Sequence, residues 1–134
     1  MKFLIDNNLS PYLAKAIAAL CEPDSVQVQH LRDKFPENTP DVDWIAALAT
    51  EGDWAIVSQD RLTRKSPERE ALRRSGLTAF ILAKGWSNLQ EWDKAWHLIR
   101  WWQRIMQGAG LVSGGAFEVP VVFSGKGMLK QIAL

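Results

Sequence analysis

The feature that most limits how this chain can fold is the alternation of short apolar runs with stretches of about ten residues that have helical character. Five runs have the length and composition of strands: residues 2–5, 26–30, 54–58, 77–82 and 117–123. Four intervening stretches carry helical spacing or capping signals: residues 11–20, from 39–41 to 51–53, 67–75 and 88–107. This alternation predicts βαβ units with right-handed crossovers. The expected class is therefore α/β, with a parallel sheet covered by helices on both faces.

Local turn and capping residues predict the ends of several elements. Ser10 is a good N-cap and Pro11 suits the first helical position, so the first helix is expected to begin there. The polar segment 32–39 and the glycine-containing segment 108–115 are predicted to be loops. Pro120 has no backbone N–H to donate, so the last strand is expected at an edge of the sheet.

Length and composition predict a single domain over residues 1–134, with its core in about 1–107 and a C-terminal loop and edge strand in about 108–134. The shares of hydrophobic residues (47%) and charged residues (23%) are ordinary for a globular protein. The one cysteine, Cys21, excludes a disulfide scaffold and a cysteine-rich zinc site. No apolar stretch reaches 18 residues and no signal peptide is recognised, so we expect a cytoplasmic protein without a membrane span.

The net charge of +1 conceals a division along the chain. Residues 22–59 contain eight acidic and two basic residues, whereas residues 60–74 contain three acidic and six basic residues. The sign changes at Asp60, just after the third predicted strand. A nearly neutral total excludes nucleic-acid binding by bulk charge, but the separate basic block is suited to holding phosphates.

Four aspartates are expected to meet at one edge of the predicted sheet. Asp6 and Asp60 follow the first and third strands, and Asp41 and Asp43 begin the helix before the third strand. In parallel α/β sheets the carboxyl ends of the strands share one crevice. Clustered carboxylates repel one another, and a hard divalent cation such as Mg²⁺ or Mn²⁺ relieves that repulsion. Helix capping is the alternative explanation for Asp41, and the helix dipole is the alternative for Asp43.

The residues after Asp60 add groups that suit a phosphodiester. Thr63 supplies a hydroxyl for a metal-bound water or a phosphate oxygen, and cations for a nucleic-acid backbone come from Arg61, Arg64 and Arg69. The alternative for the more distal arginines is a solvated helix face with ordinary charge spacing.

Four short segments, taken in order, carry a family resemblance. They read Phe-Leu-Ile-Asp-Asn-Asn-Leu-Ser, His-Leu-Arg-Asp, Thr-Pro-Asp-Val-Asp-Trp-Ile and Val-Ser-Gln-Asp-Arg, at residues 3–10, 30–33, 39–45 and 57–61. In this order and spacing they resemble the PilT N-terminal (PIN) domain superfamily. More narrowly, they are similar to its compact PIN-like branch, whose better-known relatives are VapC-type toxins. The resemblance covers about residues 2–82.

The resemblance implies a three-layer α/β/α PIN-like fold with a central, mainly parallel sheet. It also implies a metal-dependent endoribonuclease with an acidic pocket for Mg²⁺ or Mn²⁺. By likeness, Asp6 and Asp60 match the acids after the first and third strands, and Asp41 or Asp43 matches the middle acid, which is usually a glutamate. We therefore expect Asp6, Asp43 and Asp60 to be catalytic and all four aspartates to ligate the metal.

The chain departs from the family pattern after the third predicted strand. The fourth acid that often follows there is absent, so Thr63 or Asn8 is expected to complete the site. His30 and Arg32 lie at the end of the second predicted strand, and similar residues recur in PIN-like relatives. They are expected to bind substrate or to brace the pocket from behind. The alternative for His30 is a hydrogen-bonded structural histidine.

Five of the seven tryptophans lie between Trp86 and Trp102. One face of the predicted helix is expected to be core, because apolar residues recur on it at helical spacing: Leu89, Trp92, Trp96 and Ile99. A second face is also apolar: Leu98, Trp101 and Ile105. A helix that is apolar nearly all round is either deeply buried or covered by a partner. The surplus aromatic area therefore predicts an interface, with a second copy of the chain or with an antitoxin protein.

Three functional hypotheses follow from these patterns. The leading one is a Mg²⁺- or Mn²⁺-dependent ribonuclease that hydrolyses RNA phosphodiester bonds and is the toxin of a toxin–antitoxin pair. The second is a receiver-like signalling domain, because its acids and lysine are imitated by Asp6, Asp60 and Lys84. The third is a catalytically degenerate PIN-like module that binds a partner protein.

Overall fold

The computed structural model describes residues 1–60 and 66–134. The predicted substrate residues Arg61, Thr63 and Arg64 lie outside the described residues. The described elements follow one another in this order: β1 (Lys2–Ile5), α1 (Pro11–Cys21), η1 (Glu22–Asp24), β2 (Gln27–His30), α2 (Leu31–Lys34), α3 (Asp41–Glu51), β3 (Trp54–Ser58), α4 (Pro67–Ser75), β4 (Thr78–Leu82), η2 (Lys84–Asn88), α5 (Glu91–Leu111), β5 (Gly115–Val119) and β6 (Lys130–Ile132).

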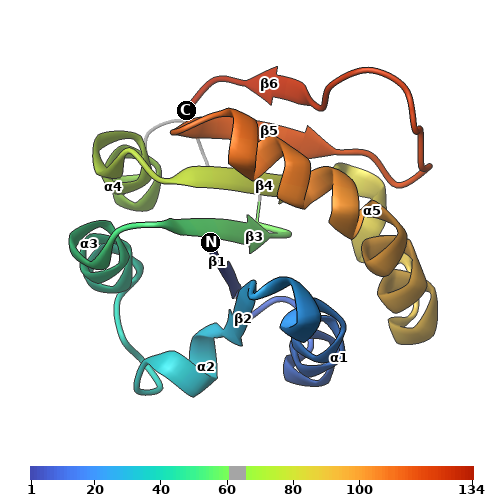
Figure 1. The fold of residues 1–134 in the computed structure, drawn as a ribbon. Coiled ribbons are helices and arrows are strands. Elements are labelled where there is room, and N and C mark those ends of the chain that lie inside the picture. Colours follow the sequence, from blue (N-terminus) through green and yellow to red (C-terminus); the bar gives the residue numbers. More distant parts are fainter. Residues whose placement is uncertain (61–65) are drawn as a thin grey trace.

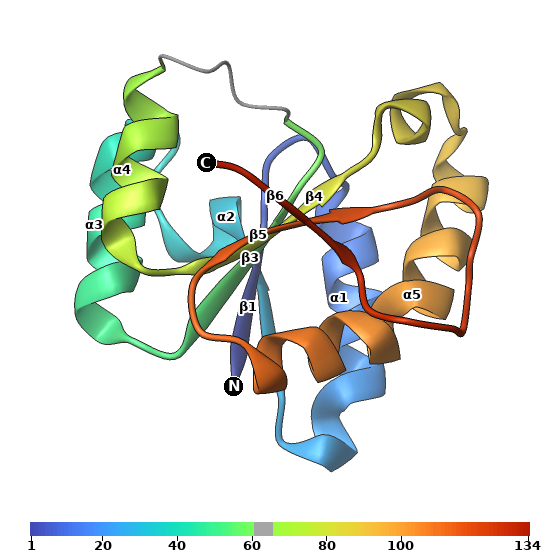
Figure 2. The same ribbon diagram turned by 90° about the horizontal axis from the view of Figure 1, so that it is seen from above.

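The strands form one six-stranded sheet with the order β2-β1-β3-β4-β5-β6 (Figure 1). Strands β1 to β5 pair in parallel, and β6 pairs antiparallel with β5. Helices α3 and α4 cover one face of this sheet, and α1 and α5 cover the other (Figure 2). The predicted three-layer α/β/α PIN-like fold with a mainly parallel sheet is confirmed.

The strand register brings the predicted site residues to one edge of the sheet. Ile5 at the end of β1 lies between His30 of β2 and Val57 of β3. The segments that follow these parallel strands therefore emerge side by side. Asp6 comes immediately after β1, and Asp60 comes two residues after β3.

Alternate side chains of the central strands build two separate cores. On β1, Phe3 and Ile5 belong to the core under α1 and α5, whereas Leu4 belongs to the core under α3 and α4. Strands β3 and β4 are buried along their whole length. Helices on both faces explain why these strands are continuous apolar runs in the sequence.

The first helix begins as predicted. The Ser10 hydroxyl oxygen accepts hydrogen bonds from the backbone N–H groups of Tyr12 (3.0 Å) and Leu13 (3.4 Å), and Pro11 occupies the first helical position. In the part of the chain that the structure describes, no helix is both long enough and apolar enough to cross a membrane.

Two segments predicted to be loops are partly helical. In the first, α2 occupies residues 31–34, because the His30 ring caps its first turn. In the second, α5 continues through Gly108 to Leu111. A Cβ at Gly108 would lie 3.2 Å from Cε1 of Phe80, so this glycine allows α5 to pack closely against β4 rather than ending the helix.

The prediction of an edge strand at residues 117–123 is wrong. Strand β5 lies between β4 and β6, so the edge of the sheet belongs to β6. Pro120 follows the last residue of β5, where a missing N–H removes no hydrogen bond from the ladder. At three residues, β6 is too short to leave a recognisable pattern in the sequence.

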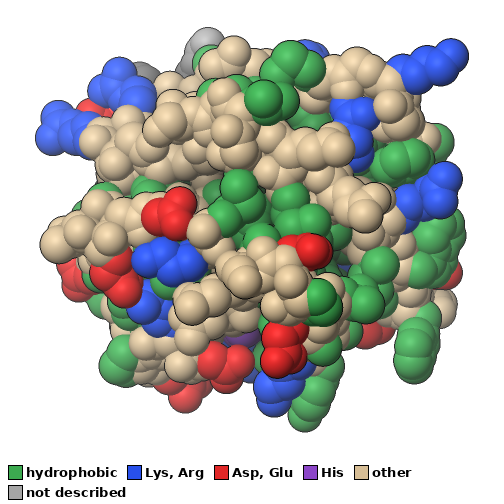
Figure 3. Space-filling view, viewed as in Figure 1, with side chains coloured by type: hydrophobic (Ala, Val, Ile, Leu, Met, Phe, Trp, Pro, Cys, Tyr) green, Lys and Arg blue, Asp and Glu red, His purple; other side chains and the backbone are tan. Residues whose placement is uncertain are grey.

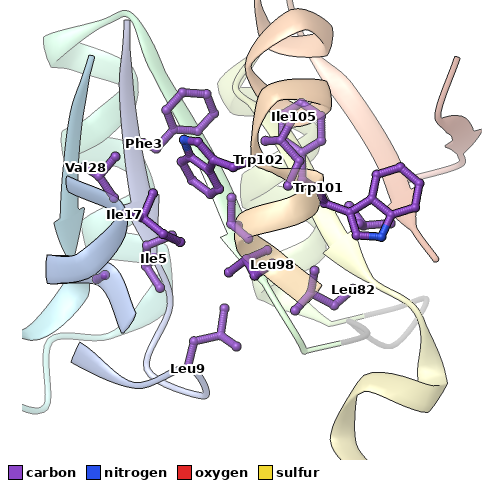
Figure 4. Close-up of a cluster of buried hydrophobic side chains, with 14 of the residues drawn as sticks. Phe3, Ile5, Leu9, Ile17, Val28, Leu82, Leu98, Trp101, Trp102 and Ile105 are labelled. Atoms are coloured by element: carbon purple, nitrogen blue, oxygen red, sulfur yellow. The ribbon is translucent and has the colours of Figure 1, made fainter. Parts of the chain in front are cut away.

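Helix α5 buries a different face from the one predicted to be core. Its buried face carries Lys94, Leu98, Trp101, Trp102 and Ile105, whereas Trp92 and Trp96 are 88% and 53% exposed. Figure 4 shows the Trp102 indole reaching toward Phe3 of β1, and the ring centroids are 4.9 Å apart. The Trp102 Nε1–H also donates to Sγ of Cys21 in α1 (3.1 Å). Contacts with β1 and α1, which helical spacing does not reveal, therefore select the buried face.

Candidate acidic site

A small cavity lies where β1 and β3 end, beside the first turns of α3 and α4. Its oxygen-bearing side chains come from four segments of the chain: Asp6, Asp41, Ser58 with Asp60, and Glu68. Its remaining lining is apolar: Trp44, Ile45, Ile56, Leu72 and Ile81. A volume of about 20 Å³ is enough for a water molecule or a metal ion and too small for a nucleotide. Any nucleic-acid substrate would therefore meet this cavity from outside.

The carboxylate of Asp6 ties the end of β1 to the end of β3. Its Oδ1 accepts the backbone N–H of Asn7 (2.6 Å), and its Oδ2 accepts the hydroxyl of Ser58 (2.7 Å). The Ser58 hydroxyl oxygen in turn accepts the backbone N–H of Asp60 (3.0 Å). These hydrogen bonds fix the position of the Asp6 carboxylate relative to the backbone of Asp60.

The same carboxylate is costly to ionise. Burial raises the pKa of Asp6 above its ordinary value of 3.8, and the nearby charges of Asp41 and Asp60 raise it further. Hydrogen bonds from Ser58 and from the N–H of Asn7 lower this pKa, but the net shift is upward. The site therefore concentrates negative charge that a bound cation would neutralise.

The structure brings Asp41 to the cavity and leaves Asp43 outside it. Asp41 is half-buried, and its Oδ1 accepts the indole N–H of Trp44 (2.9 Å). The N-cap position belongs to Pro40, and Asp41 is the first residue of α3. Two positions along a helix turn the side chain by about 200°, and Asp43 is exposed on another side of α3. Asp41 is therefore better placed than Asp43 to act as the middle acid.

Glu68 is a site residue that the sequence analysis did not identify. It is half-buried in the first turn of α4, which Ser66 caps by accepting the backbone N–H of Arg69 (3.1 Å). The fourth acid of the family pattern often follows soon after the third, whereas Glu68 lies eight residues after Asp60. The available signal was the Ser66-Pro67 helix start, which places an acid in the first turn of a helix that begins near the strand end.

The donor set of the cavity suits a hard divalent cation, but its arrangement is not a ready-made metal site. Carboxylate and hydroxyl oxygens are the ligands that Mg²⁺ and Mn²⁺ prefer. Within residues 1–60 and 66–134, however, no group of three or more His, Cys, Asp or Glu side chains stands together so that it could hold a metal ion. Two of the acids are instead engaged by protein donors, Asp6 by Ser58 and Asp41 by Trp44. The side chains are of the chemical type that these cations prefer, but as they stand they do not form a metal-binding group.

Two predicted site residues, Asn8 and His30, form hydrogen bonds that hold the backbone around the site. Asn8 is exposed, and its Oδ1 accepts the backbone N–H of Gln59 (3.0 Å), which links the chain after β1 to the chain after β3. His30 is 1% exposed; its Nε2 hydrogen-bonds the carbonyl of Leu9 (2.7 Å), and its Nδ1 accepts the N–H of Arg32 (3.2 Å). Both ring nitrogens of His30 thus have backbone partners, which matches its structural alternative.

Two of the predicted substrate-binding cations, Arg32 and Arg69, lie within the described residues. Arg32 is exposed in α2, and Arg69 lies in α4 next to Glu68. The Arg69 guanidinium donates to the carbonyl of Ala133, near the end of β6. Farther along α4, Glu70 forms ion pairs with Arg73 and Arg74, as the solvated-face alternative predicts for those distal arginines.

Residues 1–84 match the family model described as "PIN like domain". The matched region runs from β1 through β4 and contains all five oxygen-bearing residues of the cavity. The chain therefore belongs to the PIN-like domain family. No curated protein and no solved structure matched the chain.

PIN-like domains are commonly nucleases and usually bind divalent metals, and the family supports a nuclease-type module here. The receiver-like alternative has no support from the family match. It also leaves Asp41 and Glu68, which line the cavity, without a role.

Proposed function

We propose that the chain is a Mg²⁺- or Mn²⁺-dependent endoribonuclease that hydrolyses RNA phosphodiester bonds at the acidic cavity. One observation carries this proposal: acids that follow β1 and β3, together with acids in the first turns of α3 and α4, line a single ion-sized cavity at the carboxyl edge of a PIN-like sheet. A cavity of this kind at the carboxyl ends of parallel strands is the usual place for an active site in such folds.

The residues that would hold the metal are Asp6, Asp41 and Asp60, with Glu68 in place of the fourth acid. When bound, the metal supplies an activated water and charge stabilisation at the phosphate. Hydrolysis adds one water across a P–O bond, so the water oxygen ends on phosphorus and a proton ends on the leaving oxygen. Because the described acids do not yet form a metal-binding group, we infer that some of their side chains turn on loading.

Other residues of the chain orient the acids and hold the substrate. Ser58 and the backbone N–H of Asn7 fix the two oxygens of Asp6, and Trp44 fixes one oxygen of Asp41. In this proposal the RNA strand is contacted by cationic and polar side chains of the chain: Asn8, Arg32, Arg61, Thr63, Arg64 and Arg69.

The exposed aromatic face of α5 supports a protein partner for this enzyme. Trp92, Trp96 and Ile99 are all exposed, and Figure 3 shows hydrophobic side chains gathered over α5. A second copy of the chain or an antitoxin would cover this apolar area. We therefore extend the proposal to the toxin of a toxin–antitoxin pair that acts on RNA in the cytoplasm.

A non-catalytic PIN-like protein-binding module is the second candidate. The observation that favours it is that the described residues contain no group able to hold a metal ion as they stand. Metal titration distinguishes the two candidates, because the module would bind neither Mg²⁺ nor Mn²⁺ at the cavity.

The nuclease proposal is tested by neutralising the acids one at a time. Asp6→Asn, Asp41→Asn and Asp60→Asn should each reduce Mn²⁺-dependent cleavage of a labelled RNA by at least about a hundredfold, because each removes a charged oxygen ligand. Circular dichroism checks that each variant remains folded. Asp24→Asn, at an exposed aspartate outside the cavity, is the matched control and should retain wild-type cleavage.

Undiminished cleavage by Asp6→Asn or Asp60→Asn would end the nuclease proposal for this cavity. Comparing the cleavage activities of Asp43→Asn and Asp41→Asn shows which aspartate serves as the middle acid. If Asp43→Asn loses activity and Asp41→Asn keeps it, the sequence-based choice of Asp43 is right and the choice from the structure is wrong.

A further inference from the structure

A second cavity adjoins the acidic site, on the side of α2. Its volume is about 200 Å³, and its lining includes Asn7, Arg32, Phe35, Glu37, Asn38 and Thr39. These residues belong to the chain after β1, to α2 and to the segment between α2 and α3 (Figure 1). The cavity is smaller than the roughly 300–1,000 Å³ of pockets for drug-sized ligands. Its size suits one planar ring system.

Two stretches of backbone connect this cavity directly to the acids. Asn7 lines the cavity, and its N–H donates to the Asp6 carboxylate. Thr39 also lines it and is followed by Pro40 and Asp41. Adjacent Cα atoms are about 3.8 Å apart, so at these two points the cavity begins one or two residues from the acidic site. A nucleotide spanning both sites would have its phosphate at the acids and its base in the cavity.

The loop between α2 and α3, which forms one wall of the cavity, is fixed by hydrogen bonds within the loop. The Thr39 hydroxyl and the Thr39 N–H both donate to the carbonyl of Pro36, at 2.6 and 3.2 Å. Phe35, at the end of α2, is half-buried and packs against the core under α3 and α4, and the Lys34 ammonium lies over its ring, 5.5 Å from the centroid. A ring fixed in this way loses little conformational entropy when a flat ligand stacks on it.

The polar groups around Phe35 include both hydrogen-bond donors and acceptors. Arg32, Glu37 and Asn38 line the cavity and are exposed, so each side chain is accessible to a ligand. A guanidinium donates to paired acceptors, and a carboxylate accepts from paired donors. Guanine has acceptors at N7 and O6 on one edge and donors at N1 and N2 on the adjoining edge. Adenine, uracil and cytosine lack this pairing of two adjacent donors with two adjacent acceptors.

We propose that this second cavity is a nucleobase subsite that takes guanine, with Phe35 as the stacking surface, Glu37 as acceptor and Arg32 as donor. The inference rests on the proposed function, because it assigns the base to the RNA strand that is cut at the acidic site. It gives the enzyme a sequence preference for a guanine at one fixed position relative to the cleaved bond.

The subsite is tested by binding, without reference to cleavage. The full chain is titrated with the 5′-monophosphates of guanosine, adenosine, cytidine and uridine, and the backbone amide signals are followed by NMR. We expect saturable shifts at Asn7, Asn38 and Thr39, with the guanosine nucleotide bound at least about tenfold more tightly than the others, since paired hydrogen bonds discriminate by about 1–3 kcal/mol.

Variants separate base recognition from phosphate binding. Glu37→Gln should abolish the preference for guanine, whereas Phe35→Leu, which keeps an apolar side chain of similar volume, should weaken all four nucleotides alike. Glu22→Gln, at an exposed glutamate that does not line this cavity, is the matched control. Equal affinities for the four nucleotides with no effect of Glu37→Gln would overturn the inference, because Arg32 would then be binding phosphate alone. Absence of saturable shifts would overturn it as well.

Cleavage mapping on RNAs that differ in one base provides the second readout. A guanine at a constant position beside every cut supports the subsite. Cleavage by the wild type without base preference overturns the subsite and leaves the nuclease proposal intact. Guanine-selective binding by a chain that cleaves no RNA supports the subsite as a base-binding cavity and overturns the nuclease proposal.

Discussion

At the scale of single residues, Asp6 has the environment that bears most directly on chemistry. Its carboxylate is held by Ser58 and Asn7 and lies near two further acids, so the fold fixes its orientation while raising the pKa of the group. An ionised Asp6 therefore stores unfavourable free energy in the metal-free protein. Such a residue is poor for stability and well suited to holding a cation.

This stored free energy predicts how stability depends on pH. Because the folded-state pKa of Asp6 is raised, the metal-free folded protein binds its proton more tightly than the unfolded chain, and stability falls as the pH rises above about 4 through that raised pKa. Metal-free Asp6→Asn should therefore have a larger free energy of unfolding than the wild type at pH 7. The difference should shrink as the pH approaches 3, where both side chains are neutral. Urea denaturation over this pH range measures it.

Adding Mn²⁺ should reverse that order, since an ion bound at the cavity stabilises only the chain that binds it. At about a hundred times the dissociation constant, binding contributes about 2.7 kcal/mol. If metal-free Asp6→Asn is less stable than the wild type at pH 7, the hydrogen bonds of the carboxylate outweigh its burial and the explanation is wrong.

At the scale of elements, α5 shows how a helix with two apolar faces selects one of them. Trp102 contacts Phe3 of β1 and Cys21 of α1, whereas Trp92 is 88% exposed. Both faces have helical spacing, so periodicity alone does not separate them. Gly108 also favours this orientation, because the absence of a side chain there allows the buried face of α5 to approach Phe80 of β4.

Two tryptophan variants measure this choice. Trp102→Ala should lower the free energy of unfolding by about 3–5 kcal/mol, because it leaves a cavity between α5 and β1. Trp92→Ala should change it by less than about 0.5 kcal/mol, as is usual for an exposed side chain. Urea denaturation of the two variants gives both values. Equal losses would mean that the Trp92 face is also buried in solution, which is the outcome expected for a tight dimer through α5.

At the scale of the whole molecule, the charges are divided along the sequence between an acidic block and a basic block. In Figure 3, most of the acidic side chains in view lie in the lower half, where lysine and arginine side chains lie among them. The sequence places the compensating basic block in residues 60–74, which include α4. A net charge of +1 is therefore compatible with a local basic segment that binds phosphates through a small number of lysine and arginine side chains.

The salt dependence of RNA binding tests this arrangement. Metal-free binding of a single-stranded RNA should weaken with salt, with a slope of log K against log [salt] of about −2, which corresponds to about three phosphate contacts. Arg69→Ala should make the slope less steep by about 0.7. Lys126→Ala, at an exposed lysine outside the basic block, is the control and should leave the slope unchanged. An unchanged slope in Arg69→Ala would remove α4 from the RNA-binding surface.

The sequence alone is sufficient for the order of the main strands and helices, the start of α1 at Ser10, and the placement of Asp6 and Asp60 after neighbouring strands. These features depend on local periodicity, capping residues and the short reach of a chain between consecutive elements. The sequence also led to the PIN-like family, because the relevant segments keep their order along the chain.

Only the tertiary structure decided which of several equivalent side chains faces the site or the core. It brought Asp41 rather than Asp43 to the cavity, added Glu68 from α4, and buried Trp102 rather than Trp92. In each pair both residues satisfy the local pattern. The rotation of a helix about its axis is set by contacts with distant strands and helices, and those contacts are formed only when the whole sheet is assembled.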